Sequence, residues 1–157
     1  MTETRARGWI APALATLGLA DAAYLAILHF QGEVPPCGGY AGCGQVNSSP
    51  YAELFGFPIA AFGALIYLAI LAAALWRWRA GGEAWAAATL VLYTLSLAAT
   101  VFMSYLTALE LFVIQAICYW CVALAAITLV LLGLSSRDVL SVGSRPAGGR
   151  ASSSARS

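Results

Sequence analysis

The stretch "IQAICYWCVALAAITLVLL" (residues 114–132) decides the fold, because it places Cys118 and Cys121 in a run of nearly unbroken apolar residues. About 20 such residues are enough for a helix to cross the hydrocarbon core of a bilayer. The rest of the 157-residue chain is similar, with 61% hydrophobic and only 10% charged residues and a mean hydropathy of +0.81. A soluble domain of this size could not bury so much apolar surface. The sequence therefore predicts an integral membrane protein.

Hydrophobic runs of spanning length occur four times and predict an all-α bundle of four transmembrane helices. The predicted spans are residues 9–30, 58–76, 85–106 and 111–132. We assign residues 1–134 to this membrane domain. Residues 135–157 are rich in Ser, Gly and Arg and have no apolar period, so we expect a disordered cytoplasmic tail.

The basic residues predict the orientation of the spans. All eight are arginines, and they lie before the first span, between the second and third, and after the fourth. The positive-inside rule makes these segments cytoplasmic, so both termini are inside and the loop at residues 31–57 faces out. A chain rich in alanine, glycine and arginine but without lysine is typical of a high-GC genome, which favours a bacterial inner membrane. The net charge of +1 gives no reason to expect nucleic acid as a partner.

The four cysteines fall into two pairs near the outer face. Cys37 and Cys43 lie in the glycine-rich outer loop, and Cys118 and Cys121 lie three apart in the fourth predicted span. Since that span is expected to begin outside, Cys118 should lie roughly 10 Å of helical rise into it. All four thiols would then belong to an oxidising compartment, where disulfides form and persist.

Three interpretations of these cysteines compete. Two structural disulfides are one, although a bridge within CxxC on a regular helix is strained and easily reduced. A Cys₄ zinc site is another, but no histidine lies nearby. A c-type haem is excluded, because Val122 stands where CxxCH requires histidine. We prefer a thiol–disulfide relay, in which the glycines let the loop move and Cys43 shuttles between Cys37 and Cys118.

A relay needs a final electron acceptor. The chain contains no flavin or nicotinamide fingerprint, no metal motif and no haem ligand pair. An acceptor that a thiol can reach inside the bilayer must be lipid-soluble and take two electrons. By elimination we expect a quinone, either menaquinone or ubiquinone.

The ordered set of motifs resembles the vitamin K epoxide reductase family. It comprises Cys37-x5-Cys43, Ser49 six residues later, "GFPIAAFGALIY" (residues 56–67) opening the second span, and Cys118-x-x-Cys121 in the fourth. The resemblance extends over roughly residues 8–134. It implies a four-helix bundle that encloses a quinone, covered on its outer side by a short helix from the first loop.

The resemblance also implies a role for each cysteine. Cys37 would accept electrons from a separate thioredoxin- or DsbA-like protein, and Cys43 would pass them to Cys118. Cys121 would then react with the quinone. The products would be a disulfide in the partner and a quinol in the membrane, so the enzyme would sustain disulfide formation outside the cytoplasm.

Quinone-binding residues follow from the same resemblance: Ser49, Phe62, Tyr67 and Cys121. The chain departs from vertebrate members at two vitamin-contacting positions, where Ile59 replaces an asparagine and Ala125 a tyrosine. These departures favour plain quinone reduction over epoxide reduction.

Other interpretations remain open at this stage. The DsbB family shares the chemistry, but its CxxC lies in the first outer loop, the reverse of the order here. A non-enzymatic membrane scaffold with structural disulfides is the alternative from another class. Asp21 within the first span and His29 at its outer end are candidates for proton transfer, although packing and interfacial roles explain them more simply. We expect a monomer.

Overall fold

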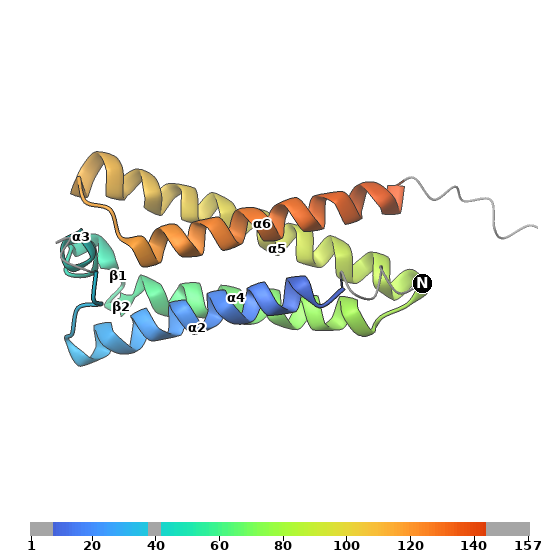
Figure 1. The fold of residues 1–157 in the computed structure, drawn as a ribbon, viewed down its shortest axis with the longest axis horizontal. Coiled ribbons are helices and arrows are strands. Elements are labelled where there is room, and N and C mark those ends of the chain that lie inside the picture. The colour runs from blue at the N-terminus through green and yellow to red at the C-terminus, as the bar shows by residue number, and fades with distance from the viewer. Residues whose placement is uncertain (1–7, 38–41, 144–157) are drawn as a thin grey trace, which may run out of the picture.

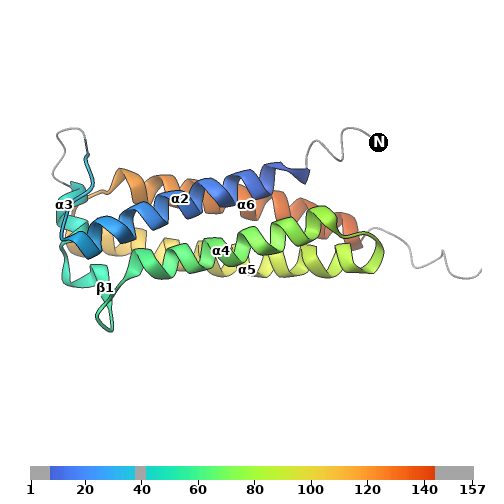
Figure 2. The same cartoon turned by 90° about the horizontal axis from the view of Figure 1, so that it is seen from below.

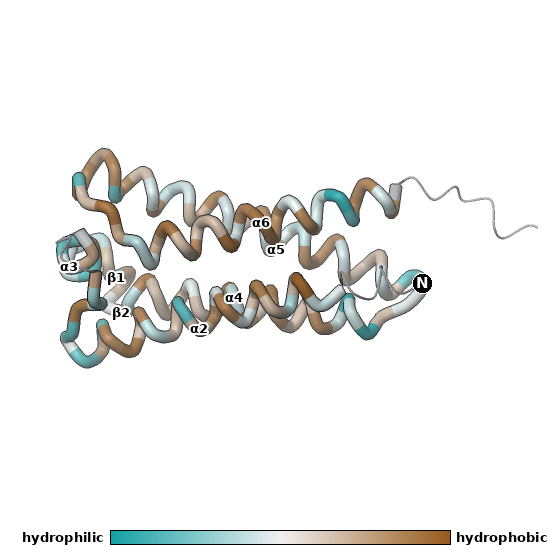
Figure 3. Tube along the Cα trace, viewed as in Figure 1, coloured by the Kyte–Doolittle hydropathy of each residue, from teal (hydrophilic) through white to brown (hydrophobic). Residues whose placement is uncertain are grey.

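Four long helices form an antiparallel bundle (Figures 1 and 2). The computed structural model describes residues 8–37 and 42–143. The helices are α2 (Ile10–Gln31), α4 (Ile59–Arg79), α5 (Gly82–Ala108) and α6 (Tyr119–Gly143). Each is long and apolar enough to cross a membrane, and apolar residues extend along all of them (Figure 3). The predicted all-α fold with four spans is confirmed.

The segment between α2 and α4 folds over one end of the bundle (Figure 1). It contains the short helix α3 (Gly42–Asn47), the 3₁₀ turn η1 (Pro50–Ala52) and a hairpin of β1 (Glu53–Leu54) and β2 (Phe57–Pro58). We call the described residues of this segment, 32–37 and 42–58, the lid. Phe55 and Gly56 make the hairpin turn with φ of 54° and 81°. The short helix predicted for the first loop is present as α3.

Small residues let the first two spans pack closely. A Cβ added at Gly18 of α2 would lie 2.1 Å from Cε1 of Tyr67 on α4, so the ring occupies the space that a side chain would need. Ala15 and Ala22 on α2 are fully buried. Close approach of backbones at small residues is the usual basis of helix association in lipid. The Tyr67 hydroxyl continues the contact by donating to the Leu124 carbonyl of α6 at 2.8 Å.

The arginine-bearing helix ends gather at the end of the bundle opposite the lid. Arg77 of α4 forms an ion pair with Asp138 of α6, and Trp78 lies against Gly8 before α2. Two helices separate each arginine-bearing segment from the next, so all three segments lie at the same end of the bundle.

The fourth helix is longer than the sequence predicts. α6 continues to Gly143, so residues 135–143 are helical and the boundary predicted after residue 134 is wrong. Ser135 is buried, and its hydroxyl donates to the Leu131 carbonyl at 2.8 Å. The ion pair at Asp138 holds the next turn against α4. The rest of the predicted tail, residues 144–157, lies outside the described residues.

The turn between the third and fourth spans is also misplaced in the prediction. α5 continues into the π-helical segment η2 (Leu109–Ile114), and the chain reverses at Gln115, which has a left-handed φ of 55°. The predicted fourth span therefore begins too early. Cys118 does not lie two turns inside a helix but immediately before the first residue of α6.

Candidate active site

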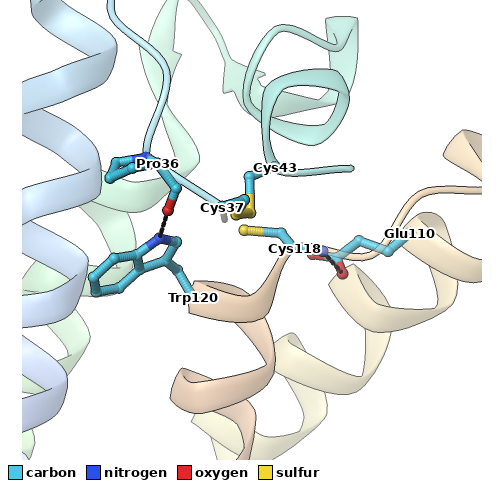
Figure 4. Close-up of a disulfide and its surroundings, with 6 residues drawn as sticks. All are labelled: Pro36, Cys37, Cys43, Glu110, Cys118 and Trp120. Atoms are coloured by element: carbon cyan, nitrogen blue, oxygen red, sulfur yellow. Dashed lines mark hydrogen bonds between the residues drawn. A yellow bond between two sulfur atoms is a disulfide. The ribbon is translucent and has the colours of Figure 1, made fainter. Parts of the chain in front are cut away.

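Three of the four predicted cysteines meet where the lid covers the start of α6. Cys37 and Cys43 form a disulfide with a Cα–Cα distance of 6.1 Å. Cys118 is a free thiol, 2% exposed, and its side chain points at that disulfide (Figure 4). Cys121 is also free and lies one helical turn further into the bundle. A Cys118 thiol therefore has one disulfide in front of it and a second thiol behind it.

Two contacts hold the disulfide above Cys118. On the Cys43 side, Gly42 packs so closely on the Ile117 backbone that an added Cβ would lie 2.4 Å from the Ile117 carbonyl oxygen. On the Cys37 side, the Trp120 indole donates to the Pro36 carbonyl at 3.2 Å (Figure 4). Both anchors belong to the short stretch that carries the CxxC. These two contacts thus fix the position of the lid relative to the dithiol.

The start of α6 favours the thiolate form of Cys118. The Cys118 carbonyl accepts the first helical hydrogen bond from the Val122 N–H at 3.0 Å, so Cys118 caps the positive end of the helix dipole. A hydrogen bond from the Cys121 thiol lowers the pKa of Cys118 most strongly, against burial and the nearby Glu110 carboxylate, which raise it. The net pKa lies below the ordinary value of 9.0.

A largely apolar pocket lies below the cysteines and the lid. Leu25, Ile59, Phe102, Met103 and Leu124 are among its apolar lining residues. Its polar lining groups come from the lid, η2 and α6: Asn47, Ser49, Tyr51, Glu110 and Cys121. An apolar cavity with a few polar groups at one end suits a flat, lipid-soluble molecule.

The structure places the four predicted quinone-binding residues differently. Ser49 and Cys121 line the pocket, and the Ser49 hydroxyl donates to the Val46 carbonyl at 2.8 Å. Tyr67 instead lines a small neighbouring cavity deeper in the bundle. Phe62 is half-buried on α4 and lines neither cavity. The sequence motif therefore brings only part of the predicted set to the pocket.

Glu110 is the residue that the sequence analysis missed. It is 4% exposed, because the π-helical turn of η2 directs it into the bundle. Its Oε2 accepts a hydrogen bond from the Cys118 N–H at 3.2 Å (Figure 4), and its carboxyl contacts the Cys121 thiol. In the sequence it falls in the turn between the predicted spans at residues 85–106 and 111–132. The one available signal was a single carboxylate within the apolar run before the CxxC.

The two other candidates for proton transfer lie outside the pocket lining. His29 Nε2 is 3.1 Å from Glu53 Oε1, which joins the end of α2 to the lid hairpin. Asp21 lies at mid-helix on α2, and its Oδ1 is buried without a hydrogen-bond partner among the described residues. Neither side chain reaches the cysteines.

Comparison with known families agrees with this geometry. Residues 9–136 match the sequence model described as the Vitamin K epoxide reductase family. The match covers the first three membrane helices, the lid and α6 as far as residue 136, and it contains the four cysteines. The chain therefore belongs to the vitamin K epoxide reductase family and is a multi-pass membrane oxidoreductase of the thiol–disulfide kind.

Proposed function

We propose that the protein is a thiol:quinone oxidoreductase that reoxidises a thioredoxin- or DsbA-like protein and reduces a membrane quinone. The observation that carries the proposal is the position of the CxxC pair. Cys118 points at the lid disulfide, while Cys121 lines the apolar pocket. The pair thus touches both the entry point for electrons and the place where a lipid-soluble acceptor can bind.

The relay runs through three exchanges that conserve atoms and electrons. A partner dithiol first reduces the Cys37–Cys43 disulfide and becomes a disulfide itself. The Cys43 thiolate then attacks Cys118 of a Cys118–Cys121 disulfide and releases Cys121 as a thiol. Cys37 attacks Cys43, which restores the lid disulfide and leaves Cys118 reduced. The two electrons now reside on the Cys118–Cys121 dithiol, and each step is an ordinary thiolate attack on sulfur.

The pocket residues fit a quinone ring. The apolar groups from α2, α4 and α5 would contact the ring faces and tail, and Ser49 offers a hydroxyl at the outer end. When bound, the quinone supplies a two-electron acceptor beside Cys121. Ile59 presents only hydrocarbon to this pocket, which supports plain quinone reduction over epoxide reduction. Menaquinone and ubiquinone both fit these requirements.

The arginines support an orientation for the relay. Arg77, Arg79 and Arg137 lie at the end of the bundle away from the lid, and the positive-inside rule would make that end cytoplasmic. The lid and its disulfide would then face the extracytoplasmic side of a bacterial inner membrane. A soluble partner meets the lid there, and disulfide formation in that compartment is the expected outcome.

The test is quinone reduction by purified protein in quinone-containing vesicles, with a reduced DsbA-like protein as the electron donor. We expect turnover in the unmodified protein and none in Cys43→Ala or Cys121→Ala. A Cys→Ala change at either position removes one handover and leaves the helices intact. Full turnover in either variant would refute the relay. No turnover in any protein, and no quinone in its lipid extract, would instead support a scaffold with a structural disulfide.

A further inference from the structure

Glu110 is a buried acid that forms no ion pair among the described residues. The two ion pairs among the described residues are His29–Glu53 and Arg77–Asp138, so neither includes it. Burying a carboxylate costs several kcal/mol unless hydrogen bonds or a cation compensate. Its compensation comes from the dithiol itself, through the Cys118 N–H and the Cys121 thiol.

The place of Glu110 in the pocket adds a second argument. It lines the same cavity as Cys121, so its carboxyl borders the space for the acceptor beside the reacting sulfur. A π-helical segment creates this placement, and such segments occur most often at functional sites. Oxidising a dithiol releases two protons, and reducing a quinone consumes two. A carboxyl beside both partners can carry a proton from one to the other.

We infer that Glu110 is the catalytic base that takes the proton of the Cys121 thiol and delivers it into the pocket. This inference rests on the proposed quinone reduction. The Cys121 S–H proton moves to the Glu110 carboxylate as the sulfur gives up its electrons, and the Cys118 thiolate closes the Cys118–Cys121 disulfide. The acceptor gains two electrons, one proton from Glu110, and a second proton from water that replaces the one Cys118 lost on ionising.

If Glu110 had a purely structural role, Glu110→Gln would leave the reaction with the acceptor unchanged. Its only backbone contact to the CxxC is acceptance from the Cys118 N–H, and the amide oxygen of a glutamine accepts that bond equally well. Glu110→Gln therefore keeps the shape and the acceptor oxygen while it removes the carboxylate that can take up a proton. Glu33→Gln, on the exposed lid, is the matched control for loss of one carboxyl.

The first measurement is a single turnover. Fully reduced protein is mixed with a water-soluble quinone analogue, quenched with acid, and alkylated for mass spectrometry of Cys118 and Cys121. General acid–base catalysis contributes about 10² to 10⁴ in rate, so we expect Glu110→Gln to close the disulfide about 100-fold more slowly. Exchange between a small dithiol and the Cys37–Cys43 disulfide, which does not involve Cys121, should keep its rate. Disulfide closure in Glu110→Gln at the unmodified rate would overturn the inference and leave the proposed function standing.

The second measurement does not depend on quinone. In reduced protein the infrared S–H stretching band of Cys121, assigned with Cys121→Ser, should be shifted to low frequency, because the Cys118 sulfur and the Glu110 carboxylate share its proton. Glu110→Gln should move this band, and Glu33→Gln should not. An unmoved band would overturn the inference even if unmodified protein failed to reduce quinone. That failure by itself would count against the proposed function alone.

Discussion

Substitution of Gly42 by alanine adds a single methyl group that should push the lid away from the dithiol. Its added Cβ would lie 2.4 Å from the Ile117 carbonyl oxygen and 3.1 Å from the Ile117 nitrogen. Both partners are backbone atoms in the turn that carries Cys118, so no flexible side chain can move aside. Gly42→Ala must therefore push α3, and Cys43 with it, away from the CxxC.

The size of the effect follows from the geometry. Ordinary contacts begin near 3.4 Å, so relief of the clash needs a displacement of about 1 Å. Sulfur exchange requires three sulfur atoms in line, and a misplacement of 1 Å can cost about 10²-fold in rate. We expect electron transfer from Cys43 to Cys118 to slow by about that factor. The fold should survive, because alanine stabilises a helix by about 0.5–1 kcal/mol relative to glycine.

Gly44 provides the matched control, since it lies on the same short helix directly after Cys43. A Cβ there would lie 3.6 Å from Val34 Cγ1, an ordinary contact. Gly44→Ala therefore makes the same chemical change on α3 without the clash. We expect it to transfer electrons at the unmodified rate.

The assay starts from protein without quinone, with both disulfides oxidised. A saturating small dithiol reduces the lid, and acid quenching with alkylation reports when Cys118 and Cys121 become thiols. Cys43→Ala supplies the background for direct attack on the CxxC. If Gly42→Ala matches the unmodified protein, or if Gly44→Ala slows equally, the close approach does not position the exchange and the reasoning is wrong.

Further predictions concern the CxxC and its neighbours. Cys37→Ala should accumulate a Cys43–Cys118 disulfide, visible by mass spectrometry of linked peptides, because the thiol that attacks Cys43 to complete the exchange is gone; a Cys43–Cys121 link would contradict the order of the relay. Since the hydrogen bond from Cys121 lowers the pKa of Cys118, the Cys118 thiolate persists to lower pH. Alkylation of Cys118 by a small reagent should therefore reach half its maximal rate below pH 9.0, and Cys121→Ala should move that midpoint upward; an unmoved midpoint would refute the hydrogen bond as its cause. Trp120→Phe removes the indole hydrogen bond to the lid, worth about 0.5–1.5 kcal/mol, so lid-to-dithiol transfer should slow by about two- to tenfold in the same assay, and no slowing would show that this bond does not hold the lid.

The sequence by itself determined the number of spans, the grouping of the cysteines into a loop pair and a CxxC pair, and the position of the loop that forms the lid. The thickness of a bilayer sets the length of each apolar run, and this constraint acts on every segment separately. The arginines likewise mark three segments as belonging to the same side of the membrane, and each of these segments can be recognised by itself. The spacing of Cys37 and Cys43, and that of the CxxC, can likewise be read from one segment without knowing what packs against it.

Only the tertiary structure decided where the third helix ends and what surrounds the dithiol. A carboxylate in an apolar run normally marks an exposed turn, but Glu110 finds donors at Cys118 and Cys121, so the helix continues past it and reverses at Gln115. The cavity that these groups share with Ser49 depends on contacts between segments far apart in sequence. Burial of a polar group is stable only when its partners are in place, and no single segment contains those partners.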